Sequence, residues 1–476
     1  MKNGLRIHKL FLSVVSKQCT QTGVISIFTQ KHGCLRIPFV LITNFLITFA
    51  VFAITPARCT AFPEAYELLI IGPESYRPTL QRFIDFKLGQ GIVAHYFSVE
   101  SINESLQGSD LAWKLHEFVS EEFKRSGIKY LLLVGTYERV PTKYVYSPSY
   151  EFEFADFNYK PTDWYYAVPD WEDSKIGLLG GNVPRIAVGR LPVRDEEELE
   201  RTLSKIIKAE AHPEAGSFLL FGDFSDEAEP VLNVPYICYA ANGNLTSKLL
   251  SKTLFDGVAY AMSYSHGTAS ALWTKTNDGE WKTLLTCRDV GDIEATYSIQ
   301  FLIACFTGAL DLANESLARA LISSSAGPAL VIASSRTEGS GETISSNFWA
   351  AFFNTGDIGR SFLDALQLYV SDQSIFSVRE PRFLQYNFYL TKVVYGDVSW
   401  RMEDPRKNVV VNSTSTPPSL PESGETNTLG RDVATPVDQL VALPLLAVFL
   451  CCAFGIELMN HKPRIAHVRK RLIEDS

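Results

Sequence analysis

The sequence lacks the excess of basic residues that a nucleic-acid-binding protein carries. Its 476 residues include 44 Lys and Arg against 53 Asp and Glu, which gives a net charge of −9 at pH 7. A nucleic-acid binder normally presents a basic face, so we expect no nucleic-acid partner. Apolar residues are not scarce, since 46% of the chain is enough for a sizeable core, and the length allows about three domains.

Charge is also missing from two stretches, and both predict contact with a membrane. Residues 1–36 contain Lys and Arg but no Asp or Glu, and the uncharged, apolar run 37–55 follows them. This order is typical of a signal peptide or signal anchor, which we place at residues 1–61, with cleavage before Phe62 as one alternative. A second uncharged run lies within residues 437–458 and predicts a transmembrane helix.

The residues on either side of the second run indicate its orientation. Residues 459–476 are basic and are predicted to stay cytoplasmic, because Lys and Arg flank membrane helices on that side. Residues 401–436 are rich in Ser, Thr and Pro, which predicts a stalk. We therefore expect a protein of the cell membrane whose main body, residues 62–400, is extracytoplasmic.

Cysteine is scarce in that body. Of the eight cysteines in the chain, only Cys238, Cys287 and Cys305 lie outside the predicted signal and membrane segments. An odd number in an exported body indicates at least one free thiol. Two alternatives stay open: a Cys238–Cys287 disulfide that leaves Cys305 free, or no such pair.

Signals for strands and helices alternate through the body. Buried strands are predicted by the apolar runs 66–72, 92–99 and 129–134. Apolar residues at helical spacing lie between these runs, and such alternation predicts a mainly parallel α/β sheet. A second series of the same kind begins at Ser217. We therefore predict two consecutive α/β subdomains, residues 62–214 and residues 215–400.

Two reactive side chains each follow an apolar run. Residues 258–264 end shortly before His266, and residues 297–304 end directly before Cys305. Because parallel strands present their carboxyl ends at one edge of a sheet, we expect these two side chains to lie together as a nucleophile and its base. Gly267 lets the main chain approach a substrate, and its N–H is a candidate oxyanion donor. The alternative is a buried Cys and an unrelated loop His.

Ser265-His266-Gly267, followed by Ala304-Cys305-Phe306-Thr307-Gly308, resembles the gingipain-like cysteine peptidase family of the caspase-like clan. Four other segments match the family's recurring ones in its order: 130–135, 161–167, 184–194 and 395–397. The caspase signature itself, Gln-Ala-Cys-x-Gly, is absent. The resemblance covers about residues 66–400. It implies a caspase-like fold and a cysteine endopeptidase that acts on polypeptides and requires no cofactor.

The resemblance also implies roles for further residues. Asp223 stands where relatives place an acid that supports the catalytic His, and Ser335 and Arg336 are expected to border the substrate cleft. Relatives that cleave after Arg carry an acid a short distance beyond Asp223. Val234 stands near that place in this sequence, so Arg specificity is not expected here.

Calcium binding by some relatives draws attention to the long acidic connection at residues 136–181. Its candidate ligands are Asp156, Asp163, Asp170, Glu172 and Asp173. EF-hand spacing is absent, which favours a solvated acidic loop over a calcium site.

Two other functions are compatible with the same sequence. In a transpeptidase of this fold, an amine instead of water would resolve the acyl-enzyme and attach proteins to a surface. In a catalytically retired relative, the fold would serve for binding alone. The presence of both His266 and Cys305 favours an enzyme.

Overall fold

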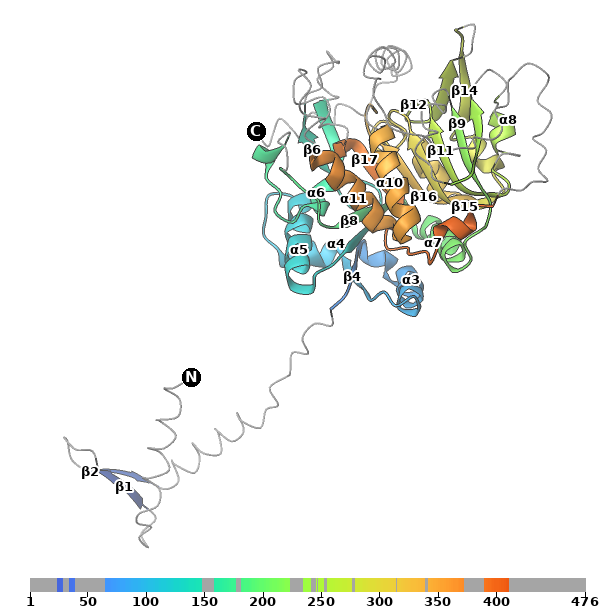
Figure 1. The fold of residues 1–476 in the computed structure, drawn as a ribbon. Helices are drawn as coiled ribbons and strands as arrows, with labels where there is room; N and C mark the ends of the chain where they lie inside the picture. The colour runs from blue at the N-terminus through green and yellow to red at the C-terminus, as the bar shows by residue number, and fades with distance from the viewer. Residues whose placement is uncertain are drawn as a thin grey trace. The chain divides into compact units, whose positions relative to one another are not determined.

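The computed structural model describes two short stretches near the N-terminus and most of the chain from residue 65 to residue 410 (Figure 1). The described ranges are 24–28, 34–38, 65–147, 158–176, 181–222, 234–240, 245, 247–251, 255–275, 279–313, 315–338, 341–371 and 389–410. The chain divides into two units, Met1–Glu64 and Ala65–Ser476. In the first unit, β1 (Val24–Phe28) pairs antiparallel with β2 (Cys34–Pro38), a hairpin that the sequence pattern did not predict.

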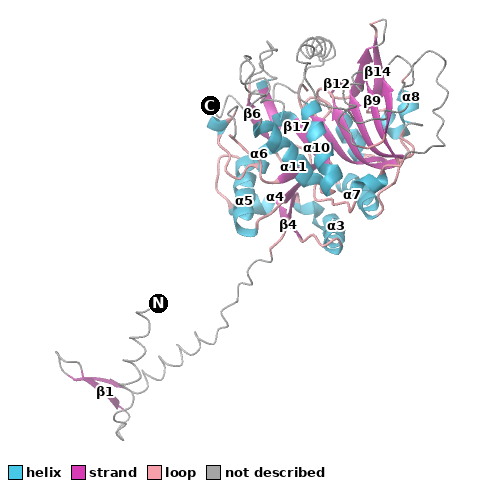
Figure 2. Ribbon diagram, in the orientation of Figure 1, coloured by secondary structure: helices cyan, strands magenta, loops and turns pink. Residues whose placement is uncertain are grey.

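A ten-stranded sheet forms the centre of the second unit (Figure 2). Its order is β10 (Tyr236–Ala240), β9 (Ser217–Gly222), β11 (Val258–Tyr264), β15 (Thr296–Ile303), β16 (Gly327–Ser334), β17 (Lys392–Gly396), β8 (Ala187–Leu191), β5 (Tyr130–Val134), β3 (Leu68–Gly72) and β4 (Ala94–Ser98). Every neighbouring pair in it is parallel except β16 with β17. The predicted mainly parallel α/β architecture is confirmed.

The antiparallel pair divides this sheet into two halves. Ser334, at the carboxyl end of β16, lies opposite Lys392, at the amino end of β17. The strands from β10 to β16 therefore end at one edge, and those from β17 to β4 end at the other. β17 belongs to the predicted second subdomain, yet it pairs with β8 of the first through Tyr395 and Arg190. One sheet thus runs through both predicted subdomains.

Both faces of the sheet are buried, which explains why its strands are continuous apolar runs. In β3, Leu68 and Ile70 belong to one core, and the alternate residues Leu69 and Ile71 belong to the other. The helices and 3-10 turns of this unit are α3 (Arg77–Gly89), α4 (Val99–Ser105), α5 (Leu111–Ser126), α6 (Trp164–Ala167), α7 (Glu196–Ala211), α8 (Ser247–Leu249), α9 (Leu317–Ser323), α10 (Gly341–Thr355), α11 (Ile358–Ser371), η1 (Glu74–Tyr76), η3 (Asp173–Lys175), η6 (Asp289–Asp292) and η7 (Pro405–Asn408).

Capping contacts close to each helix fix the ends of several helices. The Asp110 side chain accepts a hydrogen bond from the Trp113 N–H at the start of α5, and Gly127 ends that helix with a left-handed φ of 68°. Asp195 accepts from the Glu198 N–H at the start of α7. These contacts satisfy N–H groups of the first helical turn, which have no partner within the helix.

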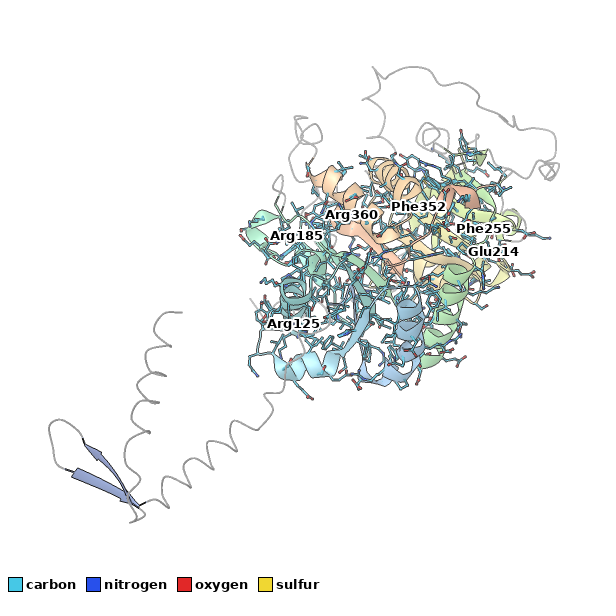
Figure 3. All side chains as sticks on the ribbon, turned by 60° about the horizontal axis from the view of Figure 1, so that its bottom comes forward. Arg125, Arg185, Glu214, Phe255, Phe352 and Arg360 are labelled. Atoms are coloured by element: carbon cyan, nitrogen blue, oxygen red, sulfur yellow. The ribbon has the colours of Figure 1, made fainter. Side chains whose placement is uncertain are left out.

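Aromatic side chains pack α10 against the half of the sheet that runs from β10 to β16. The buried Trp349 ring lies 4.8 Å from the ring of Phe218 on β9 and 5.8 Å from that of Tyr260 on β11. Phe352, labelled in Figure 3, lies 5.5 Å from Tyr260. Rings of this size bury a large apolar area and hold a helix firmly. The strands that lead to His266 and Cys305 therefore rest on a rigid layer.

Two smaller sheets accompany the large one. β12 (His266–Thr268), β13 (Ala271–Lys275) and β14 (Trp281–Thr286) form an antiparallel sheet directly after β11. β6 (Lys143–Tyr146) and β7 (Tyr159–Thr162) form an antiparallel pair within the acidic, aromatic connection. The first of these sheets carries a predicted catalytic residue.

Among the described residues, no helix is long and apolar enough to cross a membrane. The predicted transmembrane segment 437–458 and the tail 459–476 lie outside the described residues, as does most of the predicted signal segment 1–61. Residues 401–410, predicted to begin the stalk, instead pack on the body. The Val410 N–H donates to the Gly216 carbonyl at 2.8 Å, so the body extends ten residues further than predicted.

Candidate active site

His266 and Cys305 follow neighbouring strands at the same level. In the parallel pair β11–β15, Tyr264 lies opposite Ile303, and the Ser265 N–H donates to the Ile303 carbonyl at 3.1 Å. His266 and Cys305 are each two residues beyond that opposed pair. Both residues are buried, with exposed fractions of 8% and 5%. The two strand ends therefore place the main chains of His266 and Cys305 at the same edge of the sheet, on neighbouring strands.

Gly267 packs directly on the main chain of Cys305. A Cβ atom at position 267 would lie 2.5 Å from the Cys305 carbonyl oxygen, 3.1 Å from its nitrogen and 2.9 Å from the Ala304 Cβ. Atoms do not approach so closely without displacement, so only glycine permits this contact. The two main chains that we expect to supply oxyanion donors are thus adjacent.

The turn that follows Cys305 is strained and firmly held. Phe306 has a φ of 61°, the only positive φ of a non-glycine residue in the described part of the chain. Its N–H donates to the Arg336 carbonyl at 3.0 Å, and the Gly308 N–H donates to the Ser334 carbonyl at 2.8 Å. Strain of this kind persists only where surrounding contacts determine the conformation, and it is frequent at active sites.

His266 lies in an apolar, cationic environment. Its ring meets the Trp281 ring edge to face, with 4.7 Å between the ring centres. Burial, together with the charge of Lys275, lowers the pKa of His266 to about 4. The imidazole is therefore neutral at neutral pH, in the form that can accept a proton from a thiol.

Ser335 and Arg336, predicted to border the substrate cleft, lie in the segment that is hydrogen-bonded to the turn after Cys305. Their side chains bind other parts of the protein. The Ser335 hydroxyl donates to the Pro161 carbonyl on β7 at 3.1 Å. The Arg336 guanidinium forms an ion pair with Asp311 at 2.6 Å, and Asp311 also accepts from Tyr144 on β6. Both side chains are buried and already bonded to the protein. A direct contact with substrate stays a prediction.

Two residues beside Cys305 were not assigned any role by the sequence analysis. The Glu338 N–H donates to the Cys305 Sγ at 3.3 Å. The Glu338 carboxylate forms an ion pair with Lys392, the first residue of β17. Glu338 follows the predicted cleft residues Ser335 and Arg336 in the sequence, so the sequence analysis had already pointed to this segment. Lys392 carried no signal, because only the antiparallel entry of β17 brings it here.

Lys160 on β7 is a third residue that the sequence analysis missed. It is only 4% exposed, and burial with the nearby charge of Arg336 lowers its pKa to about 8. Asp223, the predicted support for His266, lies outside the described residues, so its role stays a prediction.

None of the three cysteines of the body forms a disulfide, so the alternative of a Cys238–Cys287 disulfide is wrong. Cys238 lies on β10, whereas Cys287 follows β14 and its Sγ contacts the Glu315 carbonyl at 3.7 Å. Burial, with the charge of Glu315, raises the pKa of the Cys287 thiol to about 12. Cys287 therefore behaves as a structural thiol, in contrast to a nucleophile.

The described acids of the long connection are committed to other partners. Asp163 forms a two-bond ion pair with Arg190, Asp170 pairs with Arg185, and Glu172 pairs with Lys175. Asp173 accepts from the Trp171 indole. Within the part of the chain that the structure describes, no three metal-ligating side chains gather, and Asp156 lies outside it. The described acids do not form a calcium ligand set.

Comparison with known proteins shows the family to which the chain belongs. The family model described as Peptidase family C25 matches residues 62–400. The crystal structure of the Arg specific cysteine proteinase gingipain R (RgpB) is similar, with a TM-score of 0.56 and 15% identity over 71% of this chain and 78% of that one. The complex of Porphyromonas gingivalis RgpB pro- and mature domains gives 0.55 and 16% over 71% and 79%. No curated protein matches. At these identities the structural likeness concerns the fold alone.

Proposed function

This chain belongs to peptidase family C25, and from that membership we propose a cysteine endopeptidase in which Cys305 is the nucleophile and His266 its base. The observation that carries the assignment is the common level of the two residues beyond the opposed pair Tyr264 and Ile303. A His and a Cys placed at one edge of the sheet by adjacent parallel strands support a nucleophile–base pair.

The chemistry begins with the neutral imidazole of His266, which accepts the Cys305 proton as the sulfur attacks the scissile carbonyl carbon. A C–S bond forms, and the carbonyl oxygen becomes an oxyanion that the N–H groups of Gly267 and Cys305 bind. The imidazolium then protonates the leaving amine as the C–N bond breaks. His266 then takes a proton from water as the water oxygen attacks the thioacyl carbon. The C–S bond breaks, a carboxylic acid leaves, and the imidazolium returns a proton to the sulfur. We assign Asp223 to orient His266.

The surroundings of the dyad fit a protein substrate. Ser335 and Arg336 hold the wall beside Cys305, and we place the peptide along this wall. The reaction described above uses only side-chain and main-chain groups of the chain and needs no cofactor. Arg specificity, stated for gingipain R, is not part of the proposal, because Val234 stands near the place of the expected acid.

We place this enzyme at the cell membrane. The uncharged run within residues 437–458, followed by the basic residues 459–476, favours a membrane helix with a cytoplasmic tail. The catalytic body then acts on polypeptides at the extracytoplasmic face.

Replacement of the nucleophile tests the assignment. In Cys305→Ala, hydrolysis of a peptide mixture by the purified full-length protein should fall by at least about 10⁴-fold, because no other group can form the acyl-enzyme. The thermal midpoint should change little. Cys287→Ala is the matched control and should retain activity, because the raised pKa of that thiol keeps it protonated.

The products distinguish the alternatives. Hydrolysis that persists in Cys305→Ala would refute the dyad. A new amide bond to an added amine, lost in Cys305→Ala, would identify a transpeptidase. Binding of peptides by a parent protein that neither cleaves nor transfers them would identify a retired enzyme.

A further inference from the structure

Three segments from distant parts of the chain meet at Cys305. The turn after β15 is bonded to the segment after β16, through the Phe306 N–H to Arg336 and the Gly308 N–H to Ser334. Those bonds lay residues 334–338 along the catalytic turn and bring the Glu338 N–H to within 3.3 Å of the Cys305 Sγ. β17 then enters antiparallel to β16 and places Lys392 opposite Ser334.

Lys392 is buried without solvent contact, and its charge has defined partners. Its Nζ forms an ion pair with Glu338 and donates to the Ser334 hydroxyl at 3.1 Å. The Ser334 hydroxyl also donates to the Glu338 carboxylate. The ammonium lies 5.7 Å from the centre of the Phe301 ring. A buried ion pair is costly to desolvate, and its charges act strongly on their neighbours because little water screens them.

We propose that Glu338 and Lys392 are positioning residues that set how readily Cys305 gives up its proton. The Lys392 charge favours the thiolate, the Glu338 carboxylate opposes it, and the Glu338 N–H holds the sulfur in place. The inference rests on the proposed function in that Cys305 is the nucleophile there. Burial lowers the pKa of Lys392, while Glu338 and the thiolate of Cys305 act in the opposite direction, as expected for a lysine close to both.

The remaining charges around Cys305 in the described part of the chain are fewer. β12 contributes His266, whose pKa burial and Lys275 lower to about 4, so this ring adds no positive charge at neutral pH. The segment after β16 contributes Arg336, whose charge is opposed by its ion pair with Asp311. A single substitution of Glu338 or Lys392 is therefore the most direct way to change the net charge beside the Cys305 sulfur.

Single substitutions of the pair should have opposite signs. Glu338→Gln removes the negative charge but keeps the main-chain N–H and Lys392, so the thiolate should become easier to form. Lys392→Met removes the positive charge and leaves Glu338, so the thiolate should become harder to form. In the double variant both charges are gone, and the thiol should return close to its behaviour in the parent.

Alkylation of the full-length protein measures this directly, because iodoacetamide reacts with thiolate and not with thiol. The rate at the Cys305 peptide is followed by mass spectrometry as a function of pH. We expect the midpoint pH to fall by about one unit in Glu338→Gln and to rise by about one unit in Lys392→Met. Below the midpoint, each shift is about a tenfold change in rate.

A matched control separates charge from general loss of structure. Lys87 on α3 is also fully buried, between Glu210 and Asp397 at the other end of β17. Lys87→Met should leave the Cys305 midpoint unchanged. If Lys392→Met does not fold, Glu338→Gln alone decides, and an unchanged or raised midpoint overturns the inference.

Shifts of the same sign in both single variants, no shift in either, or an equal shift in Lys87→Met would also overturn it. Alkylation does not require turnover, so its result is independent of peptide hydrolysis. A parent that hydrolyses peptides but whose midpoint ignores both substitutions refutes this inference and leaves the proposed function intact. If the parent hydrolyses no peptide but the two single variants shift the midpoint in opposite directions, the inference holds and the proposed function is refuted.

Discussion

The ten-stranded sheet has a first half, β17 to β4, and a second half, β10 to β16. The two halves are built alike but carry different residues at their carboxyl ends. Each half is parallel, buried on both faces and covered by helices. In the first half, β5 is followed by Gly135, whose N–H donates to the Leu191 carbonyl on the neighbouring strand at 2.8 Å. In the second half, β11 and β15 lead into His266 and Cys305. The architecture provides a carboxyl edge twice, and the residues placed there decide which edge can react.

Buried charge is also used differently in the two halves. In the first, the Arg190 guanidinium binds Asp163 through two hydrogen bonds and the carbonyls of Gly135 and Val140 at 2.8 Å. This single side chain joins three of the segments that resemble the family's recurring ones. Where the two halves meet, the buried pair of Lys392 on β17 and Glu338 after β16 lies beside the Cys305 sulfur. The first cluster holds loops together, and the second borders the candidate nucleophile.

Substitution of the first cluster should give the largest loss of stability. Arg190→Met leaves Asp163 buried without its partner, and the free energy of unfolding in urea should fall by about 3–5 kcal/mol. Arg185→Met is the matched control, because its ion pair with Asp170 is exposed (Figure 3 labels Arg185), and should change stability by no more than about 0.5 kcal/mol. Equal losses of stability in the two variants would show that the buried Arg190–Asp163 pair stabilises the fold no more than the exposed Arg185–Asp170 pair.

The second half should respond in activity. Gly267→Ala places a methyl group against the Cys305 main chain, so kcat/KM for peptide hydrolysis should fall by about 10²–10³-fold, the usual effect of losing an oxyanion donor. Gly291→Ala serves as the control, because a Cβ there meets no atom within 4 Å. An unchanged kcat/KM in Gly267→Ala would remove Gly267 from the site.

Lys160 lies on β7, outside the ten-stranded sheet and close enough to Arg336 to be affected by its charge. Its substitution should give the smallest effect, with the opposite sign. Its pKa in the folded state is about 8, whereas an unfolded lysine has a pKa of about 10.4. Between these values only the unfolded chain keeps the proton, so the stability of the parent should rise with pH across this window.

Below about pH 8 the buried charge destabilises the fold in full, so Lys160→Met should be more stable at pH 7 by about 1–3 kcal/mol. The variant should also lose the rise between about pH 8 and 10.4. Lys175→Met, at a more exposed site, is the control for removal of one lysine. Unfolding in urea at several pH values measures both effects, and a destabilised Lys160→Met would contradict the expected cost of this charge.

The sequence by itself determined the features that depend on neighbours along the chain. Apolar runs predicted the buried strands, because the burial of a strand shows in the residues of that strand. The adjacency of the strands before His266 and Cys305 followed from the rule that parallel strands share a carboxyl edge. The family segments around Asp163 and Arg190 were visible, although their ion pair was not.

Only the tertiary structure decided the features that depend on pairing between distant segments. β17 enters the sheet antiparallel to β16, and no periodicity in residues 392–396 reveals that direction. This entry places Lys392 near Cys305, and Cys238 on β10 and Cys287 after β14 form no disulfide with each other. A strand's own residues set its burial, but its neighbours and direction are set by the packing of the whole sheet. For that reason the sequence pointed to Cys305 as the candidate nucleophile, while the fold identified the charges around it.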